Sequence, residues 1–184
     1  MERFVIGGMK HCGKSTHGRL LAAGRQLPFF DTDEELEKFY AGTTGDALTT
    51  REIYRKLGEE EFRKLEAAVV TRLLSDDGGR VVALGGGAPG NRFIEPAVWE
   101  RGGCFIYLAI DPDEAFRRVK EGGLPPFLAG ADDPHLEFMR LYRDREQFYR
   151  RYAKVIFHAH ENASAEANAA ALAKEVECYE QQLR

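Results

Sequence analysis

The sequence predicts an α/β fold in which a parallel sheet lies between two layers of helices. Short apolar runs alternate along the chain with amphipathic segments of helical length, and a glycine-rich loop joins the first run to the first helix. Strands and helices that alternate in this way form parallel sheets, because each strand returns over the sheet through a crossover helix. With 184 residues, the chain is expected to form one domain, residues 1–184, around a single core.

Five apolar segments account for the predicted strands. Each is three to six residues long, and such short apolar runs are typical of strands that are buried on both faces of a parallel sheet. We expect strands over residues 3–6, 28–30, 81–84, 105–110 and 155–157.

Helices are predicted where apolar residues recur at helical spacing beside capping residues. Thr49 or Thr50 is expected to cap one helix, and Gly42 and Gly45 are expected to end the helix before it. Three prolines in a glycine- and alanine-rich stretch predict a surface loop over about residues 121–134 that can act as a lid. The expected helices cover residues 15–25, 34–40, 51–57, 59–74, 112–121, 135–151 and 164–184.

The composition argues against several classes of function. The formal net charge is −4, and no cluster of basic residues is interleaved with aromatics, so we expect no nucleic-acid partner. No apolar run approaches the roughly 20 residues of a membrane span. Cys12, Cys104 and Cys178 are odd in number and far apart, which favours reduced thiols over disulfides or a structural metal. With no secretory leader after Met1, we expect a cytoplasmic monomer that acts on a small molecule.

Residues 7–16, GGMKHCGKST, contain the pattern G-x-x-x-x-G-K-[ST] between a predicted strand and a predicted helix. Gly8 and Gly13 let the backbone curl so that successive N–H groups converge on phosphate oxygens. Lys14 adds a positive charge at the β- and γ-phosphates, and the Ser15 hydroxyl can ligate Mg²⁺. The stretch therefore predicts a nucleoside triphosphate site rather than an ordinary glycine-rich turn.

Two side chains inside this loop, Lys10 and His11, are unusual, and a cysteine follows them. Lys10 and His11 either add charge near the phosphates or point to solvent, and we favour solvent because the loop works through its backbone. Cys12 lies near a helix N-terminus, which can lower a thiol pKa, although a small filler is the simpler interpretation.

Two acidic residues, Asp31 and Asp33, close the second predicted strand at the edge where such sheets bind ligands. If the strand is still extended there, both carboxylates lie on one side, where one organises a metal and the other orients or deprotonates a hydroxyl. The alternative is a cluster that caps a helix. Further along, Glu59 and Arg63 have the spacing of an ordinary ion pair on a solvated helix face.

Six segments taken together resemble the shikimate kinase family in their order and spacing, over nearly the whole chain. The segments are GGMKHCGKST, FDTD, GEEEFRKLE, LGGG, the proline-bearing loop and DREQFYRRYA. The phosphate loop alone is unspecific, whereas the D-x-D, G-E-x-x-F-R-x-x-E and L-G-G-G series is specific. The resemblance implies a P-loop kinase-like three-layer α/β/α sandwich with a five-stranded parallel sheet and a mobile lid. It also implies ATP-dependent phosphorylation of the 3-hydroxyl of shikimate.

For the nucleotide, the resemblance implies that Lys14 holds the β- and γ-phosphates and that Ser15 ligates Mg²⁺. Asp31 would support the metal through water, and Arg118 lies where the family has an arginine near the adenine. The nucleotide site implied in this way also includes Gly8, Gly13 and Thr16.

For the acceptor, the resemblance implies a binding segment over about residues 33–63. Asp33 would bind the ring hydroxyls and serve as the base, or at least orient the nucleophile. Arg63 and Arg145 would clamp the carboxylate, a task that suits the planar, bidentate guanidinium. The glycine loop would bring backbone close to the ring and consists of Gly85, Gly86 and Gly87.

The chain departs from the family pattern in the lid, where Pro125 stands in place of an arginine that reaches the reacting phosphates. Lys10, Arg118 and Lys120 are candidates to supply that charge. The segment 42–57, near the acceptor, is also about two residues longer than usual.

These departures keep two alternatives open beside a working shikimate kinase. One is a related kinase for another hydroxy acid or sugar, such as gluconate, which the altered lid and acceptor segment suggest. The other is a nucleotide-binding regulatory protein without turnover, which the missing lid arginine suggests.

Overall fold

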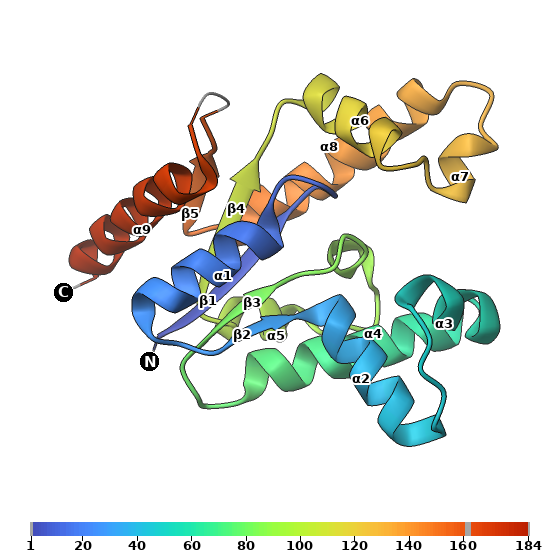
Figure 1. Cartoon of the computed structure of the whole chain (residues 1–184), viewed down its shortest axis with the longest axis horizontal. Coiled ribbons are helices and arrows are strands. Elements are labelled where there is room, and N and C mark those ends of the chain that lie inside the picture. The colour runs from blue at the N-terminus through green and yellow to red at the C-terminus, as the bar shows by residue number, and fades with distance from the viewer. Residues whose placement is uncertain (1, 161–162, 184) are drawn as a thin grey trace.

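The computed structural model describes residues 2–160 and 163–183, which contain one sheet of five parallel strands (Figure 1). The strand order is β2-β3-β1-β4-β5, and every neighbouring pair is parallel. This arrangement confirms the predicted fold class. The strands are β1 (Arg3–Gly8), β2 (Phe29–Asp31), β3 (Arg80–Ala83), β4 (Cys104–Ala109) and β5 (Val155–His158).

The register brings the carboxyl ends of the strands to one edge of the sheet. Ile6 of β1 lies opposite Ala83 of β3, and Ala83 in turn lies opposite Asp31 of β2. Gly8, at the end of β1, lies opposite Leu108 near the end of β4. The loops after β1, β2 and β3 therefore leave the sheet side by side, and each carries residues predicted to bind ligands.

Helices cover both faces of the sheet (Figure 1). On one face α1 (Lys14–Arg25) packs beside α9 (Ala165–Gln182). The other face is covered by α4 (Glu59–Ser75), α5 (Pro96–Arg101) and α8 (Pro134–Tyr152). The remaining helical elements are α2 (Thr32–Thr44), α3 (Thr50–Leu57), the 3₁₀ turn η1 (Ala88–Gly90), α6 (Pro112–Glu121) and α7 (Pro126–Ala129).

The side chains of β1 pack against both helical layers. Phe4 and Ile6 pack in a cluster with Leu21 of α1, whereas Val5 packs in the opposite cluster with Val70 of α4. Successive side chains of a strand point to opposite faces, so a wholly apolar strand needs helices on both sides.

Gly42 does not end the second helix, contrary to the prediction. It lies inside α2, where a side chain at its position would meet open space. An exposed glycine inside a helix costs only about 1 kcal/mol relative to alanine, which the rest of the helix tolerates. Gly45 does end α2, with a φ of 81° that favours glycine.

Three short helical elements, η1, α5 and α7, were not predicted. None exceeds six residues, which is too short for a clear helical period in the sequence. The segment predicted as a surface loop therefore contains one helical turn, α7. The predicted loop segment ends where α8 begins, at Pro134. Asp133 caps this helix, because its side chain accepts hydrogen bonds from the N–H groups of His135 and Leu136.

Within the described residues, no helix has both the length and the apolar character that crossing a membrane requires.

Candidate active site

A cavity of about 800 Å³ opens at the carboxyl edge of the sheet. Its walls come from the glycine-rich loop after β1, from α3 and the start of α4, and from the lid segment and α8. Nucleotide and acceptor residues predicted from the sequence share this space, and those that line it are Lys14, Ser15, Asp31, Asp33, Arg63, Gly86, Gly87 and Arg145. The other predicted residues, Gly8, Gly13, Thr16, Gly85 and Arg118, lie behind or beside it.

The phosphate loop adopts a backbone that only glycine tolerates at two positions. Gly8 has a φ of 152° and Gly13 a φ of 94°. A Cβ at Gly8 would lie 2.7 Å from the Cys12 sulfur and from a backbone oxygen of β4, and one at Gly13 would lie 2.9 Å from the His17 ring. Gly13 precedes α1 and provides no side-chain cap, so the first N–H groups of that helix are left to bind an anion.

The cations and thiol of this loop have distinct places. The Lys14 ammonium donates a hydrogen bond of 2.9 Å to the Met9 carbonyl and lines the cavity. Lys10 and His11 are exposed, and both also line the cavity. The His11 ring lies against Gly122, where the lid begins. Burial and the two nearby lysines lower the pKa of His11. Cys12 is buried beneath Gly8, which fits a space-filling role.

The loop is held from below by aromatic residues of α8 and β4. The buried Tyr149 hydroxyl donates a hydrogen bond of 2.9 Å to the Gly8 carbonyl. The Tyr149 ring stacks on Tyr107 of β4, with ring centroids 4.9 Å apart. This anchor was not predicted, since nothing in the sequence links a tyrosine on the eighth helix to a glycine 141 residues earlier.

Asp31 has two roles that the sequence left as alternatives. The Ser15 hydroxyl donates a hydrogen bond of 2.6 Å to Asp31 Oδ2, which joins the two predicted metal-binding residues. Asp31 Oδ1 accepts from the backbone N–H of Asp33 at 3.0 Å and so caps α2. The extended geometry that was one of the two alternatives does not occur, because the helix already begins at Thr32.

The Ser15–Asp31 pair fits a magnesium ion. Hydroxyl and carboxylate oxygens are hard ligands, and Mg²⁺ in kinases is usually held by one or two such groups together with substrate phosphates. The described residues contain no group of three or more histidine, cysteine, aspartate or glutamate side chains that could hold a metal by themselves.

Asp33 faces the cavity from the first turn of α2. Asp33 is exposed to the solvent that fills the cavity, yet the surrounding walls desolvate its carboxyl enough to raise the pKa to about 6, and the charges of Asp31 and Glu66 act in the same direction. A side chain at Gly85 would collide with the Asp33 carboxylate, and the Gly85 N–H donates to the Thr32 hydroxyl at 2.7 Å. Position 85 must therefore be glycine, because any side chain there would displace the Asp33 carboxylate.

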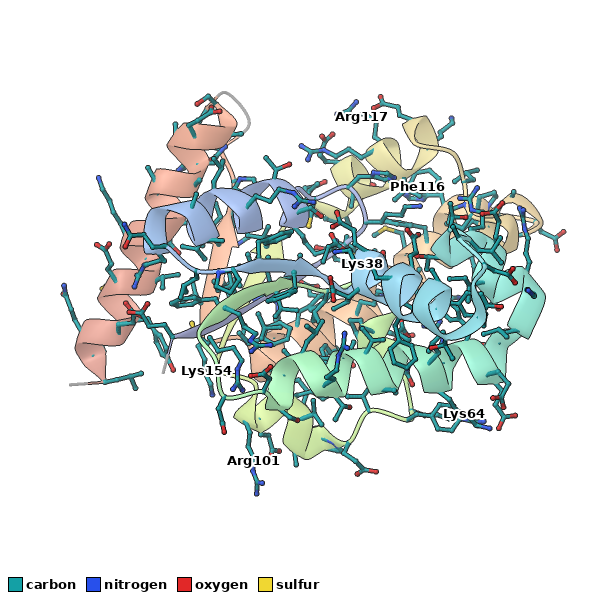
Figure 2. The ribbon with its side chains drawn as sticks, turned by 60° about the horizontal axis from the view of Figure 1, so that its bottom comes forward. Lys38, Lys64, Arg101, Phe116, Arg117 and Lys154 are labelled. Atoms are coloured by element: carbon teal, nitrogen blue, oxygen red, sulfur yellow. The ribbon has the colours of Figure 1, made fainter. Side chains whose placement is uncertain are left out.

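Arg63 pairs with Glu66 and not with Glu59. Its Nη1 lies 2.8 Å from Glu66 Oε2, and Glu66 is buried. Asn91 completes this group, because its amide donates to Glu66 Oε2 at 2.9 Å and to the Arg63 carbonyl at 2.7 Å. The solvated ion pair expected here is therefore wrong, although the next residue, Lys64, does lie on the outer surface (Figure 2).

Arg145 reaches the same region from α8. A Cβ at Gly86 would lie 3.8 Å from Arg145 Nη1, and a side chain at Gly87 would collide with Arg63 Nη1. Burial lowers the pKa of Arg145, and the positive charge of Arg63 lowers it further. No carboxylate of the described residues lies within ion-pair distance of Arg145, so its charge is available to an anionic ligand.

Arg118 lies outside the cavity, at the outer side of the phosphate loop. It pairs with Glu114 at 2.7 Å and donates to the His11 carbonyl at 3.3 Å. Its neighbour Arg117 points away from the body of the molecule (Figure 2). Thr16 is exposed on the first turn of α1.

Two further groups line the cavity, and they lie in the predicted lid and the predicted acceptor-binding segment, although of these residues only Pro125 was named in connection with the site from the sequence. The lid contributes Pro125 and Leu128, and one face of α3 contributes four residues, namely Thr50, Arg51, Tyr54 and Arg55. Lys120, a candidate for the missing lid charge, is exposed and does not line the cavity, whereas Lys10 does.

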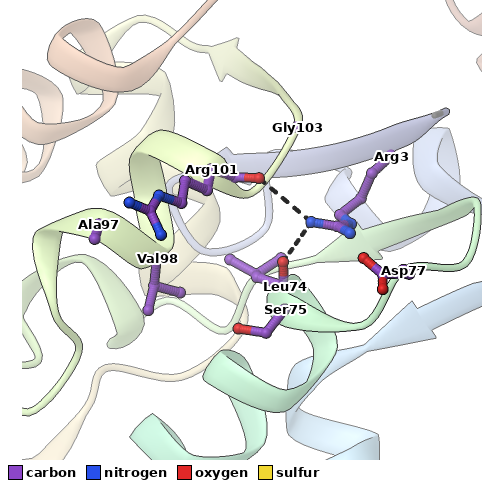
Figure 3. Close-up of a pocket in the computed structure, with 8 residues that line it drawn as sticks. All are labelled: Arg3, Leu74, Ser75, Asp77, Ala97, Val98, Arg101 and Gly103. Atoms are coloured by element: carbon purple, nitrogen blue, oxygen red, sulfur yellow. Dashed lines mark hydrogen bonds between the residues drawn. The ribbon is translucent and has the colours of Figure 1, made fainter.

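A second cavity, of about 500 Å³, lies at the opposite, amino end of the sheet (Figure 3). Arg3 of β1 dominates it and donates hydrogen bonds to the carbonyls of Leu74, Asp76 and Arg101. Those carbonyls lie at or just beyond the ends of α4 and α5, so Arg3 serves as a structural cap for both helices.

Known proteins share this architecture and sequence pattern. The family model for shikimate kinase matches residues 10–177. A shikimate kinase of Rhodococcus erythropolis is 39% identical over 153 residues, which are 82% of this chain and 83% of that protein. A shikimate kinase of Brucella canis is 39% identical over 145 residues, which are 79% of this chain and 68% of that protein.

Solved structures of shikimate kinases have the same fold as this chain. Shikimate kinase from Acinetobacter baumannii in complex with shikimate superposes with a TM-score of 0.77 and 27% identity, covering 95% of this chain and 92% of that one. The shikimate kinase of Bacteroides thetaiotaomicron superposes with a TM-score of 0.75 and 28% identity, covering 96% of this chain and 98% of that one. Because the family model and the relatives span most of the sequence that builds the cavity, the chain belongs to the shikimate kinase family.

Proposed function

We propose that this protein transfers the γ-phosphoryl group of ATP to the 3-hydroxyl of shikimate. The observation that carries the proposal is that one cavity joins the phosphate-loop lysine, Lys14, to an arginine without a carboxylate partner, Arg145. A kinase for an acidic acceptor needs these two anion sites within the length of a small molecule.

The phosphate loop binds the triphosphate. The uncapped N-terminus of α1 and the curled backbone between Gly8 and Gly13 offer N–H groups to phosphate oxygens, and Lys14 exchanges the Met9 carbonyl for the β- and γ-phosphates. Arg118 and Thr16 flank the bound nucleotide from outside the cavity. The Arg118 guanidinium, tied to Glu114 and the His11 carbonyl, is placed to border the adenine.

Ser15 and Asp31 would hold Mg²⁺, the serine directly and the aspartate through water. The ion would neutralise charge on the phosphates and orient them. The short hydrogen bond between Ser15 and Asp31 supports this assignment, because it places two hard oxygen ligands at one point of the cavity wall.

Arg63 and Arg145 bind the carboxylate of the acceptor. Arg63 is fixed by Glu66, while the Arg145 charge lacks such a partner, so an incoming carboxylate would relieve the unfavourable burial of Arg145. Gly86 and Gly87 leave room for the ring beside both guanidinium groups.

Asp33 orients the acceptor hydroxyl and takes its proton. As the hydroxyl oxygen forms its bond to the γ-phosphorus, the bond from that phosphorus to the β-bridging oxygen breaks and ADP leaves. The proton passes to Asp33, whose raised pKa of about 6 suits a base that must also release the proton near neutral pH.

The arginine pair weighs against the two alternatives. A kinase for a neutral sugar has no use for two half-buried guanidinium groups, and a regulatory protein without turnover has no need of a base with a raised pKa beside the phosphate loop. Gluconate also carries a carboxylate, so the experiment below includes it.

We further propose that the protein acts as a single-domain monomer, with residues 121–134 as a mobile lid. We place it in the cytoplasm, in the biosynthesis of aromatic amino acids. Three free cysteines support a reducing compartment.

The test is release of ADP from Mg·ATP by the purified protein with shikimate, gluconate, AMP or no acceptor. We expect saturable turnover with shikimate alone and none from a Lys14→Ala preparation made in parallel, which controls for contaminating kinases. Turnover with gluconate instead of shikimate, or no acceptor-dependent turnover in a protein that binds Mg·ATP, would refute the proposal.

A further inference from the structure

The two walls that flank the reaction cavity differ in charge. The lid segment contributes Pro125 and Leu128, and residues 121–134 contain no lysine or arginine. Opposite the lid, α3 contributes two arginines, Arg51 and Arg55. The side that closes over the phosphates in this chain therefore carries no positive charge, whereas the α3 side carries two.

Arg51 and Arg55 lie one helical turn apart, so they occupy the same face of α3. Neither forms an ion pair with any carboxylate of the described residues. Lys56 on the same helix differs, because it pairs with Asp46 at 2.6 Å and does not line the cavity. Both arginines are exposed to solvent, as Lys10 is, and because they line the cavity without a carboxylate partner they are available to an anionic ligand.

The helix that carries these arginines is firmly anchored. Thr49 and Glu52 form a capping box at its start, and the Glu37 carboxylate of α2 accepts hydrogen bonds from the N–H and hydroxyl of Thr50 at 2.7 and 2.8 Å. Ile53 is buried in the core. Arg51 and Arg55 are therefore presented from a fixed position rather than from a mobile segment.

The reaction brings two anionic groups into the cavity, the acceptor carboxylate and the triphosphate. The γ-phosphoryl group of the triphosphate is the one to which no arginine has been assigned. The proposed function assigns the acceptor carboxylate to Arg63 and Arg145, and it assigns the triphosphate to the phosphate loop, which lines the cavity together with Lys14 and Ser15. Charge on the γ-phosphate oxygens is stabilised by cations on the side away from the loop, and planar guanidinium groups suit phosphate oxygens.

We propose that Arg51 and Arg55 contact the γ-phosphate of ATP and stabilise its charge during transfer. This inference rests on the proposed function, because it assigns the two arginines to the same reaction. Arg118 is occupied by Glu114, and Lys120 lies away from the cavity, so neither supplies this charge. Lys10 lines the cavity as a single exposed ammonium group and is the natural comparison.

The test compares the native chain with the double variant Arg51→Gln/Arg55→Gln, which removes both charges but keeps unbranched polar side chains of similar helix propensity. The affinities for ADP and for the non-hydrolysable ATP analogue AMP-PNP are measured by titration calorimetry with and without shikimate. We expect the double variant to lose about tenfold in affinity for AMP-PNP while its affinity for ADP changes less than about twofold. With saturating substrates, kcat should fall about 100-fold.

Two further variants act as controls. Lys56→Gln removes one charge from the same helix outside the cavity and should leave both affinities within about twofold of native. Adding Pro125→Arg to the double variant restores a charge on the lid, so part of the lost kcat should return. Lys10→Gln reports whether an ammonium on the phosphate loop contributes more than the α3 pair.

The outcomes separate the inference from the proposed function. An unchanged preference for AMP-PNP over ADP in the double variant would overturn the inference, as would a raised KM for shikimate at native kcat, which would assign the arginines to the acceptor. A larger loss with Lys10→Gln would also overturn it. Absence of shikimate phosphorylation by the native chain would refute the proposed function, while the AMP-PNP measurement would still decide the contact.

Discussion

The two arginine-lined cavities of this molecule differ in how their charges are satisfied. At the amino end of the sheet, Arg3 donates to backbone carbonyls at the ends of α4 and α5 (Figure 3). At the carboxyl end, Arg145, Arg51 and Arg55 have no carboxylate partner among the described residues. The first arginine holds two helices together, whereas the others are available to a ligand.

This difference teaches that a charged cavity is identified as a binding site by its unsatisfied groups and not by charge alone. A guanidinium whose donors are taken by carbonyls is part of the fold, and its removal costs stability. A half-buried guanidinium without a partner, as at Arg145, is unfavourable in the empty protein, and a ligand that neutralises it gains affinity, whereas the exposed Arg51 and Arg55 are solvated by water until an anion binds. Substitutions at the two ends should therefore change different quantities.

Lys14→Ala should have the largest effect at the carboxyl end. Loss of the charge at the β- and γ-phosphates should lower kcat by at least about 10³-fold, because phosphoryl transfer depends on charge stabilisation. Thermal unfolding should be nearly unchanged, since the Lys14 ammonium makes a single hydrogen bond to Met9. Steady-state ADP release and calorimetry measure both, and native turnover in the purified variant would contradict the loop assignment.

Arg145→Leu should lower kcat/KM for shikimate by about 100-fold, chiefly through KM, because a charge-assisted bidentate contact is lost. The melting temperature should not fall, since the substitution removes a poorly hydrated charge without a partner. If the variant is instead strongly destabilised with native KM, then Arg145 is structural, like Arg3.

The pH dependence should report Asp33. With its pKa at about 6, kcat/KM should fall about tenfold for each pH unit below that value, because the base becomes protonated. A pH profile from slightly acid to neutral measures this. A profile without an inflection near pH 6, for a step limited by chemistry, would exclude Asp33 as the base.

The same carboxyl predicts an unusual stability effect. Its folded pKa lies above the ordinary value of 3.8, so between about pH 4 and 6 the folded state alone holds the proton. The Asp33 contribution to the free energy of unfolding therefore decreases as pH rises through this window. Asp33→Asn should raise the melting temperature at neutral pH while it abolishes turnover, and a lowered melting temperature would contradict the assignment.

Tyr149→Phe should have a smaller effect, of a few-fold in the KM for ATP. It leaves the Gly8 carbonyl without its buried hydrogen bond, at a cost of about 1–3 kcal/mol shared between stability and loop geometry. Tyr142→Phe on the same helix, which removes a hydrogen bond to the Ile110 carbonyl, is a matched control. Equal effects of the two variants on ATP would show that Tyr149 does not position the loop.

Arg3→Leu should have the smallest effect on activity and a clear effect on stability. Three backbone carbonyls lose their donor, so the melting temperature should fall while kcat and both KM values stay within about twofold of native. A fall in kcat that exceeds the loss of folded protein would show that the amino-end cavity communicates with the site.

Much of this molecule could be predicted from local patterns. The alternation of Phe4, Val5 and Ile6 between two helical layers and the glycines of the phosphate loop follow from rules that act within a few residues. The helix caps at Thr49 and Asp111 follow in the same way.

What could not be predicted depends on contacts between distant segments. The Glu66–Asn91 group around Arg63 and the tyrosine beneath Gly8 join residues that no local pattern relates. Whether the chain is still extended at Asp33 was left open from the sequence, and the structure settles it, because Asp31 accepts the Asp33 N–H and caps α2, which begins at Thr32. The direction in which Arg51 and Arg55 face is likewise set by where α3 packs.

The most direct test of the central claim, that the unpaired Arg145 makes this cavity specific for an acid, compares shikimate with its neutral methyl ester as acceptors. The account predicts that the native protein prefers the acid by about 100-fold in kcat/KM and that Arg145→Leu loses most of this preference. Equal use of acid and ester by the native protein, or an undiminished preference in the variant, would contradict it.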